Sequence, residues 1–236
     1  MIKEKSMNPL VSAPYIKWNA LDGRDLTDYK GVHVFKVLVS DDVNYSHLYA
    51  DVLSTDEEKK ALRFKREDDC RSYRLRKYVL RQLLSVFTGV NASAITYRYG
   101  EHKKPAVEGI AFNSSHSGNC ILIAIAPADV GIDVEHIRQD FDFDVLIDTC
   151  FTPEEQAFIN QGERRNNFFS LWTRKEAILK ANGTGLITHL NELNCLNMEV
   201  TFKGQHYILT TKNVDEQYTM SLATNAAEMQ INYWNY

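Results

Sequence analysis

The sequence predicts an α+β fold built from two halves of similar size, which meet near Pro127. Short apolar runs typical of strands occur in both halves, for example at 32–40 and 120–126. Helical periodicity also occurs in both halves, through 70–89 and through 167–181. A chain of 236 residues that is 44% hydrophobic can form one well-packed domain or two small subdomains that share a core.

The helices of the first half are indicated by end signals as well as by periodicity. Ser54 is a good N-cap residue, and Glu57 three residues later completes a capping-box pattern. In the following helix, apolar residues have the spacing of a buried face: Leu80, Leu83, Leu84 and Phe87. Gly89 fits the position that ends this helix.

The remaining elements alternate in type along the chain. Residues 1–30 have no clear pattern and are expected to form an N-terminal extension, packed or partly ordered. Further strands are predicted at 94–100, 120–126, 130–135, 195–202, 207–211, 218–224 and 229–234. Further helices are predicted at 142–150 and 153–159, and Thr152 can cap the second of these.

Composition narrows the class of protein. Four scattered cysteines without a CxxC pair, no long apolar run and no secretory signal predict a cytoplasmic protein with reduced thiols and no membrane segment. A net charge of −4 predicts no binding to nucleic acid. Neither GxGxxG nor GxxxxGK[ST] occurs in the sequence, so the common nucleotide-binding fingerprints are absent.

Charge is unevenly distributed along the chain. Residues 59–81 hold ten Lys and Arg against three acids, whereas 129–155 hold nine acids against one base. One cationic and one anionic segment fit a protein that binds a phosphate-bearing ligand together with a cation. The alternative is that both segments form solvated surfaces.

The strand GIDVE, at 131–135, carries two acids on one face. Alternate residues of a strand share a face, so Asp133 and Glu135 are expected to point the same way, about 6–7 Å apart at their Cα atoms. A divalent cation between them would relieve their repulsion, and Mg²⁺ prefers oxygen ligands of this kind. The alternative is a strand whose exposed face happens to be acidic.

A helix farther along the chain offers a third carboxylate. Glu176 and Lys180 are four residues apart and therefore lie on one helix face. They suit a metal ligand followed by a lysine that binds phosphate, although a surface ion pair would have the same spacing.

The segment NSSHSG contains a histidine among small residues. His116, near backbone N–H groups in a turn, could hold a phosphate oxygen. Hydrolase chemistry is disfavoured, because no GxSxG elbow is present and adjacent side chains of a strand face opposite ways. A surface histidine without a function is the alternative.

Four motifs occur in the order and with the spacing of one enzyme family. They are KKP at 103–105, FNSSHSG at 112–118, GIDVE at 131–135 and LWTRKEAILKANGTGL at 171–186. In these motifs the chain resembles the 4′-phosphopantetheinyl transferase superfamily, Sfp-type, from about Val32 to the C-terminal strands. The last two motifs together are highly specific, and the first two support them.

The resemblance implies a fold, a reaction and a set of residues. The fold would be two α/β subdomains related by a pseudo-two-fold axis, here at 31–127 and 128–236, with the active site in the cleft between them and the metal site in the second. The reaction would move the phosphopantetheine arm of coenzyme A to a serine of an apo acyl or peptidyl carrier protein and release adenosine 3′,5′-bisphosphate. Metal binding is implied for Asp133, Glu135 and Glu176, with Mg²⁺ as cofactor. Binding of coenzyme A is implied for Lys60, Lys104, Ser115, His116 and Lys180.

Catalysis is assigned to Glu176 and Lys180. Glu176 is the expected general base, acting directly or through a metal-bound water. Glu155, in the segment FTPEEQ, aligns with an acid of the family and is the other candidate base. The choice between Mg²⁺ and Mn²⁺ is left open.

Two other functions are compatible with the same residues. One is a different Mg²⁺-dependent phosphoryl or pyrophosphate enzyme acting on coenzyme A. The other is a non-catalytic module that binds coenzyme A or a carrier protein. Relatives of this type imply a monomer, because one chain already supplies both halves.

Overall fold

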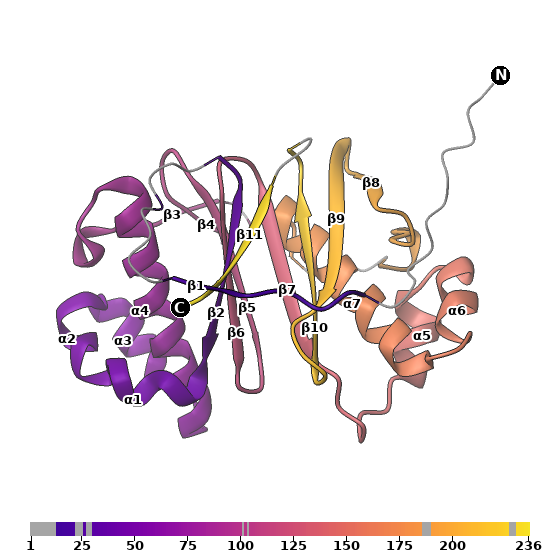
Figure 1. Cartoon of the computed structure of the whole chain (residues 1–236), viewed down its shortest axis with the longest axis horizontal. Helices are drawn as coiled ribbons and strands as arrows, with labels where there is room; N and C mark the ends of the chain where they lie inside the picture. Colours follow the sequence, from indigo (N-terminus) through magenta and orange to yellow (C-terminus); the bar gives the residue numbers. More distant parts are fainter. Residues whose placement is uncertain are drawn as a thin grey trace. The chain divides into compact units, whose positions relative to one another are not determined.

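The chain forms two compact units, each organised around its own sheet (Figure 1). The computed structural model describes residues 13–21, 26, 30–100, 102, 104–185, 190–226 and 230–236. The five-stranded unit contains the described residues of 17–129 together with 230–236. The four-stranded unit contains 13–16 and the described residues of 130–226. The α+β class is confirmed, whereas the pseudo-two-fold relation stays a prediction.

The sheet of the five-stranded unit has the order β1-β11-β2-β6-β5. Its strands are β1 (Asn19–Ala20), β2 (Val32–Leu38), β5 (Ala111–Ser117), β6 (Cys120–Ala126) and β11 (Ile231–Asn235). β11 runs parallel to β1 and β2, and the other pairs are antiparallel. Two very short strands, β3 (Arg98–Tyr99) and β4 (Pro105–Ala106), pair separately.

Helices cover one face of this sheet (Figure 1). They are α1 (Asp42–Tyr45), α2 (Tyr49–Val52), α3 (Thr55–Ala61) and α4 (Glu67–Thr88), with 3₁₀ turns at Val39–Asp41, Ser46–Leu48 and Ala92–Ala94. The buried face of α4 packs with β2 and β6 in one apolar core that includes Leu75, Val79, Leu83, Phe35, Ile121 and Ile123. The predicted end signals are confirmed: Ser54 caps α3 in a capping box with Glu57, and α4 ends at Gly89, which has φ 70°.

The sheet of the four-stranded unit is antiparallel throughout, in the order β7-β10-β9-β8. Its strands are β7 (Val130–His136), β8 (Glu199–Phe202), β9 (Gln205–Asn213) and β10 (Tyr218–Thr224). Its helices are α5 (Asp144–Cys150), α6 (Pro153–Ile159) and α7 (Arg164–Asn182), with a 3₁₀ turn at Leu190–Glu192. α7 begins three residues before its predicted start at 167, and Thr152 caps α6 as predicted.

Several predicted boundaries differ from the structure. In the predicted strand 94–100 only Arg98–Tyr99 is a strand. Residue 94 instead ends a 3₁₀ turn that begins after Asn91, whose side chain accepts a hydrogen bond from Ser93 N. The predicted strand 195–202 begins at Glu199. Before it, the backbone N–H of Cys195 donates to the Glu155 side chain rather than to a neighbouring strand.

The ends of the chain differ from the predicted division at 30 and 128. β11 pairs with β2, so the last strand belongs to the sheet of the first half rather than to 128–236. Within the predicted extension, Tyr15 pairs with Asn213 of the four-stranded unit and β1 pairs with β11 of the five-stranded unit. Residues 1–12, 22–25 and 27–29 lie outside the described part of the chain.

None of the helices that the structure describes is a candidate for a membrane span. In the part of the chain that the structure describes, none combines the length and the apolar character that a crossing requires.

A buried histidine links β2 to the last strand. Trp234 Nε1 donates a hydrogen bond of 2.9 Å to His33 Nδ1, and the rings of Phe35 and Phe87 also contact His33. The His33 residue is 6% exposed, and burial lowers the pKa of His33 to about 4. The folded five-stranded unit therefore holds this imidazole neutral as a hydrogen-bond acceptor.

We expect His33 to make the protein less stable in acid. The unfolded chain takes up a proton near pH 6.5 and the folded chain only near pH 4, so the free energy of unfolding should fall as the pH drops below 6.5, by up to about 3 kcal/mol at pH 4. Urea unfolding followed by circular dichroism between pH 7.5 and pH 4.5 measures this slope. His33→Gln keeps an acceptor for Trp234 but does not titrate, so an equally steep slope in this variant would contradict the assignment.

Candidate active site

Strand β7 carries the two predicted carboxylates on one face. In the pairing with β10, Asp133 lies opposite Ser221 and Glu135 lies opposite Thr219. Asp133 is buried and Glu135 is half-buried. The expected alternation along GIDVE therefore holds, and Gly131 shares this face two residues before Asp133.

Helix α7 lies very close to the same face of β7. A Cβ atom added to Gly131 would come 2.1 Å from the carbonyl oxygen of Ala177 and 2.3 Å from the amide nitrogen of Ala181. Only glycine permits this approach of helix backbone to strand. The close packing at Gly131 brings the Glu176–Lys180 turn of α7 onto the carboxylate face of β7.

The contact that joins the two elements is an ion pair. Lys180 Nζ lies 2.6 Å from Asp133 Oδ1. Burial raises the pKa of Glu176, and the negative charge of Asp133 raises it further, while the Lys180 ammonium lowers it. Asp133, Glu176 and Lys180 therefore form one electrostatically coupled group with two carboxylates and one cation.

The predicted metal ligands are only partly gathered. Among the described residues, no group of three or more His, Cys, Asp or Glu side chains is arranged so that it could hold a metal ion. The carboxylate oxygens are nevertheless the donors that Mg²⁺ prefers, and the coupling of Glu176 to buried Asp133 is the situation that a cation would relieve. The donor chemistry therefore fits Mg²⁺, with Lys180 as the cation that Asp133 contacts in this structure.

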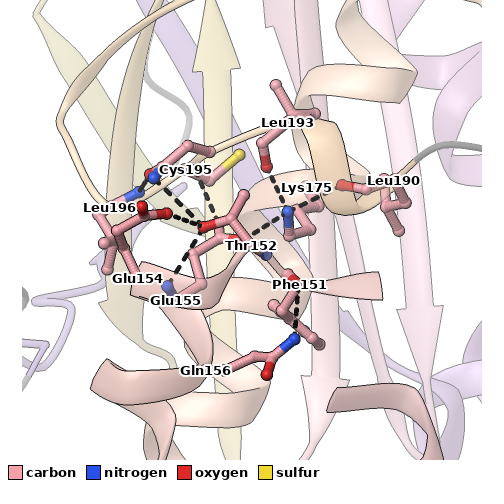
Figure 2. Close-up of polar contacts among 11 residues, drawn as sticks. Phe151, Thr152, Glu154, Glu155, Gln156, Lys175, Leu190, Leu193, Cys195 and Leu196 are labelled. Atoms are coloured by element: carbon pink, nitrogen blue, oxygen red, sulfur yellow. Dashed lines mark hydrogen bonds and ion pairs between the residues drawn. The ribbon is translucent and has the colours of Figure 1, made fainter. Parts of the chain in front are cut away.

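Glu155, the other candidate base, has a different role. Its side chain is fully buried, pairs with Lys175 Nζ at 2.7 Å and accepts hydrogen bonds from the backbone N–H groups of Thr152 and Cys195 (Figure 2). Both carboxylate oxygens are engaged by these donors. Glu155 is therefore not available to a substrate, and the prediction that it could be the base is wrong.

Two predicted ligand residues lie side by side on β5 of the five-stranded unit. Ser115 is buried, whereas His116 is exposed, as expected for neighbours in a strand. Half-buried Lys104 lies beside β4, and burial lowers the pKa of Lys104 although the charge of Asp129 opposes this effect. Lys103, the other lysine of KKP, lies outside the described residues.

The Lys and Arg residues of the cationic segment 59–81 form two overlapping groups. Part of its charge is neutralised by neighbouring acids, in the pairs Arg71–Asp68, Arg74–Glu58, Lys77–Glu57 and Arg81–Glu57. Glu57 is 7% exposed, so its carboxylate serves the capping box of α3 and the ion pair with Arg81 rather than a ligand.

Lys77 also belongs to a second group of cations, which gathers around an aromatic ring. Lys60, Arg76 and Lys77 all lie within 6.0 Å of the Tyr73 ring centroid. The pKa of Lys77 is lowered to about 8, chiefly by burial, with the positive charges of Arg76 and Lys60 acting in the same direction and Glu57 opposing them. Glu57 is already shared by Lys77 and Arg81, so the cations around Tyr73 carry more positive charge than this one carboxylate balances, and such a cluster suits an anionic ligand. Lys60 is among the residues predicted to bind the ligand, whereas Arg76 and Lys77 are not, although their one-turn spacing from Tyr73 along α4 is a signal that could have indicated them.

A cavity of about 760 Å³ lies elsewhere in the four-stranded unit. It is lined by the first turns of α7 and the loop before β10, including Asn166, Asn167, Ser170, Asp215, Glu216 and Thr219. None of the predicted site residues lines it, although Thr219 is the strand partner of Glu135.

Comparison with known proteins identifies the family. Residues 129–228, which include the β7–α7 contact, match the family model of the 4′-phosphopantetheinyl transferase superfamily. The chain is 31% identical over 165 residues to the 4′-phosphopantetheinyl transferase HetI from a Nostoc species, an alignment that covers 66% of this chain and 70% of that protein. It is 23% identical over 186 residues to the 4′-phosphopantetheinyl transferase Sfp of Bacillus subtilis, over 72% of this chain and 81% of the relative. A third relative is the 4′-phosphopantetheinyl transferase gsp of Aneurinibacillus migulanus, 34% identical over 122 residues, which cover 50% of this chain and 48% of gsp.

The class of protein follows from the fold, the site and these similarities together. The chain belongs to the 4′-phosphopantetheinyl transferase superfamily. The predicted resemblance is thereby confirmed, and the protein is an enzyme of the transferase class.

Proposed function

We propose that this protein transfers the 4′-phosphopantetheine group of coenzyme A to a serine of an apo carrier protein. The products are the holo carrier protein and adenosine 3′,5′-bisphosphate. The observation that carries the proposal is the coupled group at the β7–α7 contact, in which Lys180 pairs with Asp133 beside Glu176. Family membership supplies the reaction class, and this group supplies the charges that pyrophosphate chemistry requires.

The chemistry at this contact is a displacement at phosphorus. The serine oxygen attacks the β-phosphorus of coenzyme A, a new P–O ester forms, and the bond to the bridging oxygen breaks, leaving its electron pair on adenosine bisphosphate. Lys180 exchanges its contact with Asp133 for the phosphate oxygens as negative charge grows on the leaving group. Glu176, whose pKa is raised by burial and by Asp133, accepts the serine proton.

A divalent cation completes this proposal. Asp133, Glu135 and Glu176 would hold Mg²⁺, which neutralises the pyrophosphate charge when bound. The donor set consists of oxygens alone, so Mn²⁺ is an alternative to Mg²⁺.

The nucleotide end of coenzyme A is assigned to the five-stranded unit. We propose that His116 and Ser115 of β5 contribute to its binding, together with Lys104 and Lys60. The gathering of Arg76 and Lys77 with Lys60 around Tyr73 supports an anionic ligand there and adds these two residues to the proposal.

A mass-shift assay with a panel of apo carrier proteins tests the reaction and the partner together. Each carrier is incubated with coenzyme A, Mg²⁺ and the protein, and we expect at least one fatty-acid, polyketide or peptide-synthesis carrier to gain the mass of phosphopantetheine. Omission of coenzyme A and addition of a chelator are the controls. Phosphate release without an acceptor would instead favour another pyrophosphate enzyme, and calorimetric binding of coenzyme A with no turnover would favour a non-catalytic binding module.

A further inference from the structure

A buried ion pair lies directly next to the proposed active site. Lys175 immediately precedes Glu176 on α7, and its side chain is fully buried. Its ammonium pairs with Glu155 at 2.7 Å and donates to the carbonyl oxygens of Leu190, at 3.0 Å, and Leu193 (Figure 2). An ammonium has three N–H donors, so this one is fully satisfied inside the protein. Lys175 therefore does not serve as a phosphate ligand, although it belongs to the motif that carries Glu176 and Lys180.

The partner carboxylate is held as firmly as the lysine. Glu155 accepts from Thr152 N at 2.9 Å within the capping box of α6 and from Cys195 N at 2.7 Å. One carboxylate thus ties together the start of α6, the segment before β8 and the middle of α7. Each of these contacts is charge-assisted and shielded from water, which makes its geometry strict.

The two residues before Lys175 are anchored as well. Arg174 donates to the carbonyl oxygen of Asn197, and the Thr173 hydroxyl lies 2.9 Å from the Ser221 hydroxyl. Ser221 is the strand partner of Asp133 on β10. Three consecutive side chains therefore fix the rotation of α7 about its axis immediately before Glu176.

We propose that the Glu155–Lys175 pair is a positioning device that orients Glu176 toward Asp133 for metal binding and catalysis. Replacing a buried ion pair by neutral side chains is often no worse for stability, so stability alone gives little reason for it. Mg²⁺ requires ligand oxygens at about 2.0–2.1 Å in nearly ideal geometry, so a small rotation of α7 would weaken the site. The close approach at Gly131 fixes the distance of α7 from β7, and Lys175 fixes its rotation. This inference rests on the proposed function and assigns these two residues no contact with substrate.

The test compares variants in two measurements, transfer kinetics and Mn²⁺ binding followed by electron paramagnetic resonance in the presence of coenzyme A. Glu155→Gln combined with Lys175→Met removes both charges without leaving either one buried alone. We expect the double variant to bind Mn²⁺ about 10-fold more weakly and to lose about 10–100-fold in kcat, the usual effect of losing a residue that orients a metal ligand. KM for coenzyme A should change by less than about threefold, since no ligand contact is removed.

Two further variants separate positioning from stability. Leu209→Ala opens a cavity in the core of the same unit, so it should lower the melting temperature while kcat and Mn²⁺ affinity stay at wild-type values. Glu155→Asp keeps the charge but shortens the side chain by one methylene, so we expect an intermediate loss in both measurements. If the double variant does not fold, Glu155→Asp carries the test.

The results distinguish the possible failures. A folded double variant, or a folded Glu155→Asp, with wild-type kcat and Mn²⁺ affinity would overturn the positioning role while leaving the proposed function intact. If Leu209→Ala lost as much kcat and Mn²⁺ affinity as the double variant, the positioning role would also be overturned, because reduced stability alone would then account for both losses. A wild-type chain that modifies no carrier protein and binds no Mn²⁺ would overturn the proposed function and this inference together.

Discussion

Replacement of Glu176 by glutamine is expected to lower kcat for carrier modification by at least about 10³-fold, which corresponds to roughly 4 kcal/mol of lost transition-state stabilisation. The substitution keeps the size of the side chain but removes the carboxylate that is coupled to Asp133 and Lys180. It therefore removes a proposed metal ligand and the proposed base at once. Asp133→Ala should have a comparable effect, because it also takes away the partner of Lys180.

Steady-state transfer, measured by the mass shift of the carrier protein, gives kcat, and circular dichroism shows whether each variant is folded. Asp148→Asn is the matched control, because Asp148 is an exposed carboxylate on α5 of the same unit. We expect this control to have wild-type kcat. Near-normal rates in folded Glu176→Gln and Asp133→Ala would remove the assignment of the site to the β7–α7 contact.

Replacement of Gly131 by alanine is expected to destabilise the protein by about 3 kcal/mol or more. The new methyl group would lie 2.1 Å from the Ala177 carbonyl oxygen and 2.3 Å from the Ala181 nitrogen. These are backbone atoms of a helix, so no side chain can rotate away, and α7 must move off β7. The same displacement would separate Glu176 and Lys180 from Asp133, so activity should fall with stability.

Urea unfolding followed by circular dichroism measures the loss. Gly100→Ala is the matched control: a Cβ atom there meets nothing within 4 Å, so its unfolding midpoint should equal that of the wild type. A Gly131→Ala protein with the wild-type midpoint would show that the close contact between α7 and β7 does not form in solution.

Much of the secondary structure could be predicted because its causes are local. The capping box at Ser54, the cap at Thr152 and the left-handed Gly89 at the end of α4 all lie where the sequence indicates them. Strand alternation correctly placed Asp133 and Glu135 on one face of β7. The predicted strand starts at 94 and 195 are wrong. Near each of them a side chain accepts a hydrogen bond from a backbone N–H group, Asn91 from Ser93 and Glu155 from Cys195.

The candidate site also combines features that local sequence predicts with features that depend on distant segments. Helical spacing alone placed Glu176 and Lys180 on one face, but the partner of Lys180 is 47 residues away in sequence. Glu155 and Glu176 are both acids that fit the family pattern. The place of Glu155 three residues after Thr152, in a capping box, is a local sign of a structural role, but only the tertiary contacts show that both of its oxygens are engaged. The difference comes from Lys175 and Cys195, which engage Glu155 but not Glu176.

The sequence by itself determined most of the elements, because caps and periodicity act over a few residues. The chemical class followed from the resemblance of its four motifs to a known family. Only the tertiary structure decided that β11 joins β2, that Lys180 pairs with Asp133, and that Glu155 is held by Lys175. These outcomes depend on side chains from distant segments that meet in a buried space. Burial and these contacts then decide that both oxygens of Glu155 are engaged inside the protein, whereas Glu176 stays half-buried beside Asp133 and Lys180.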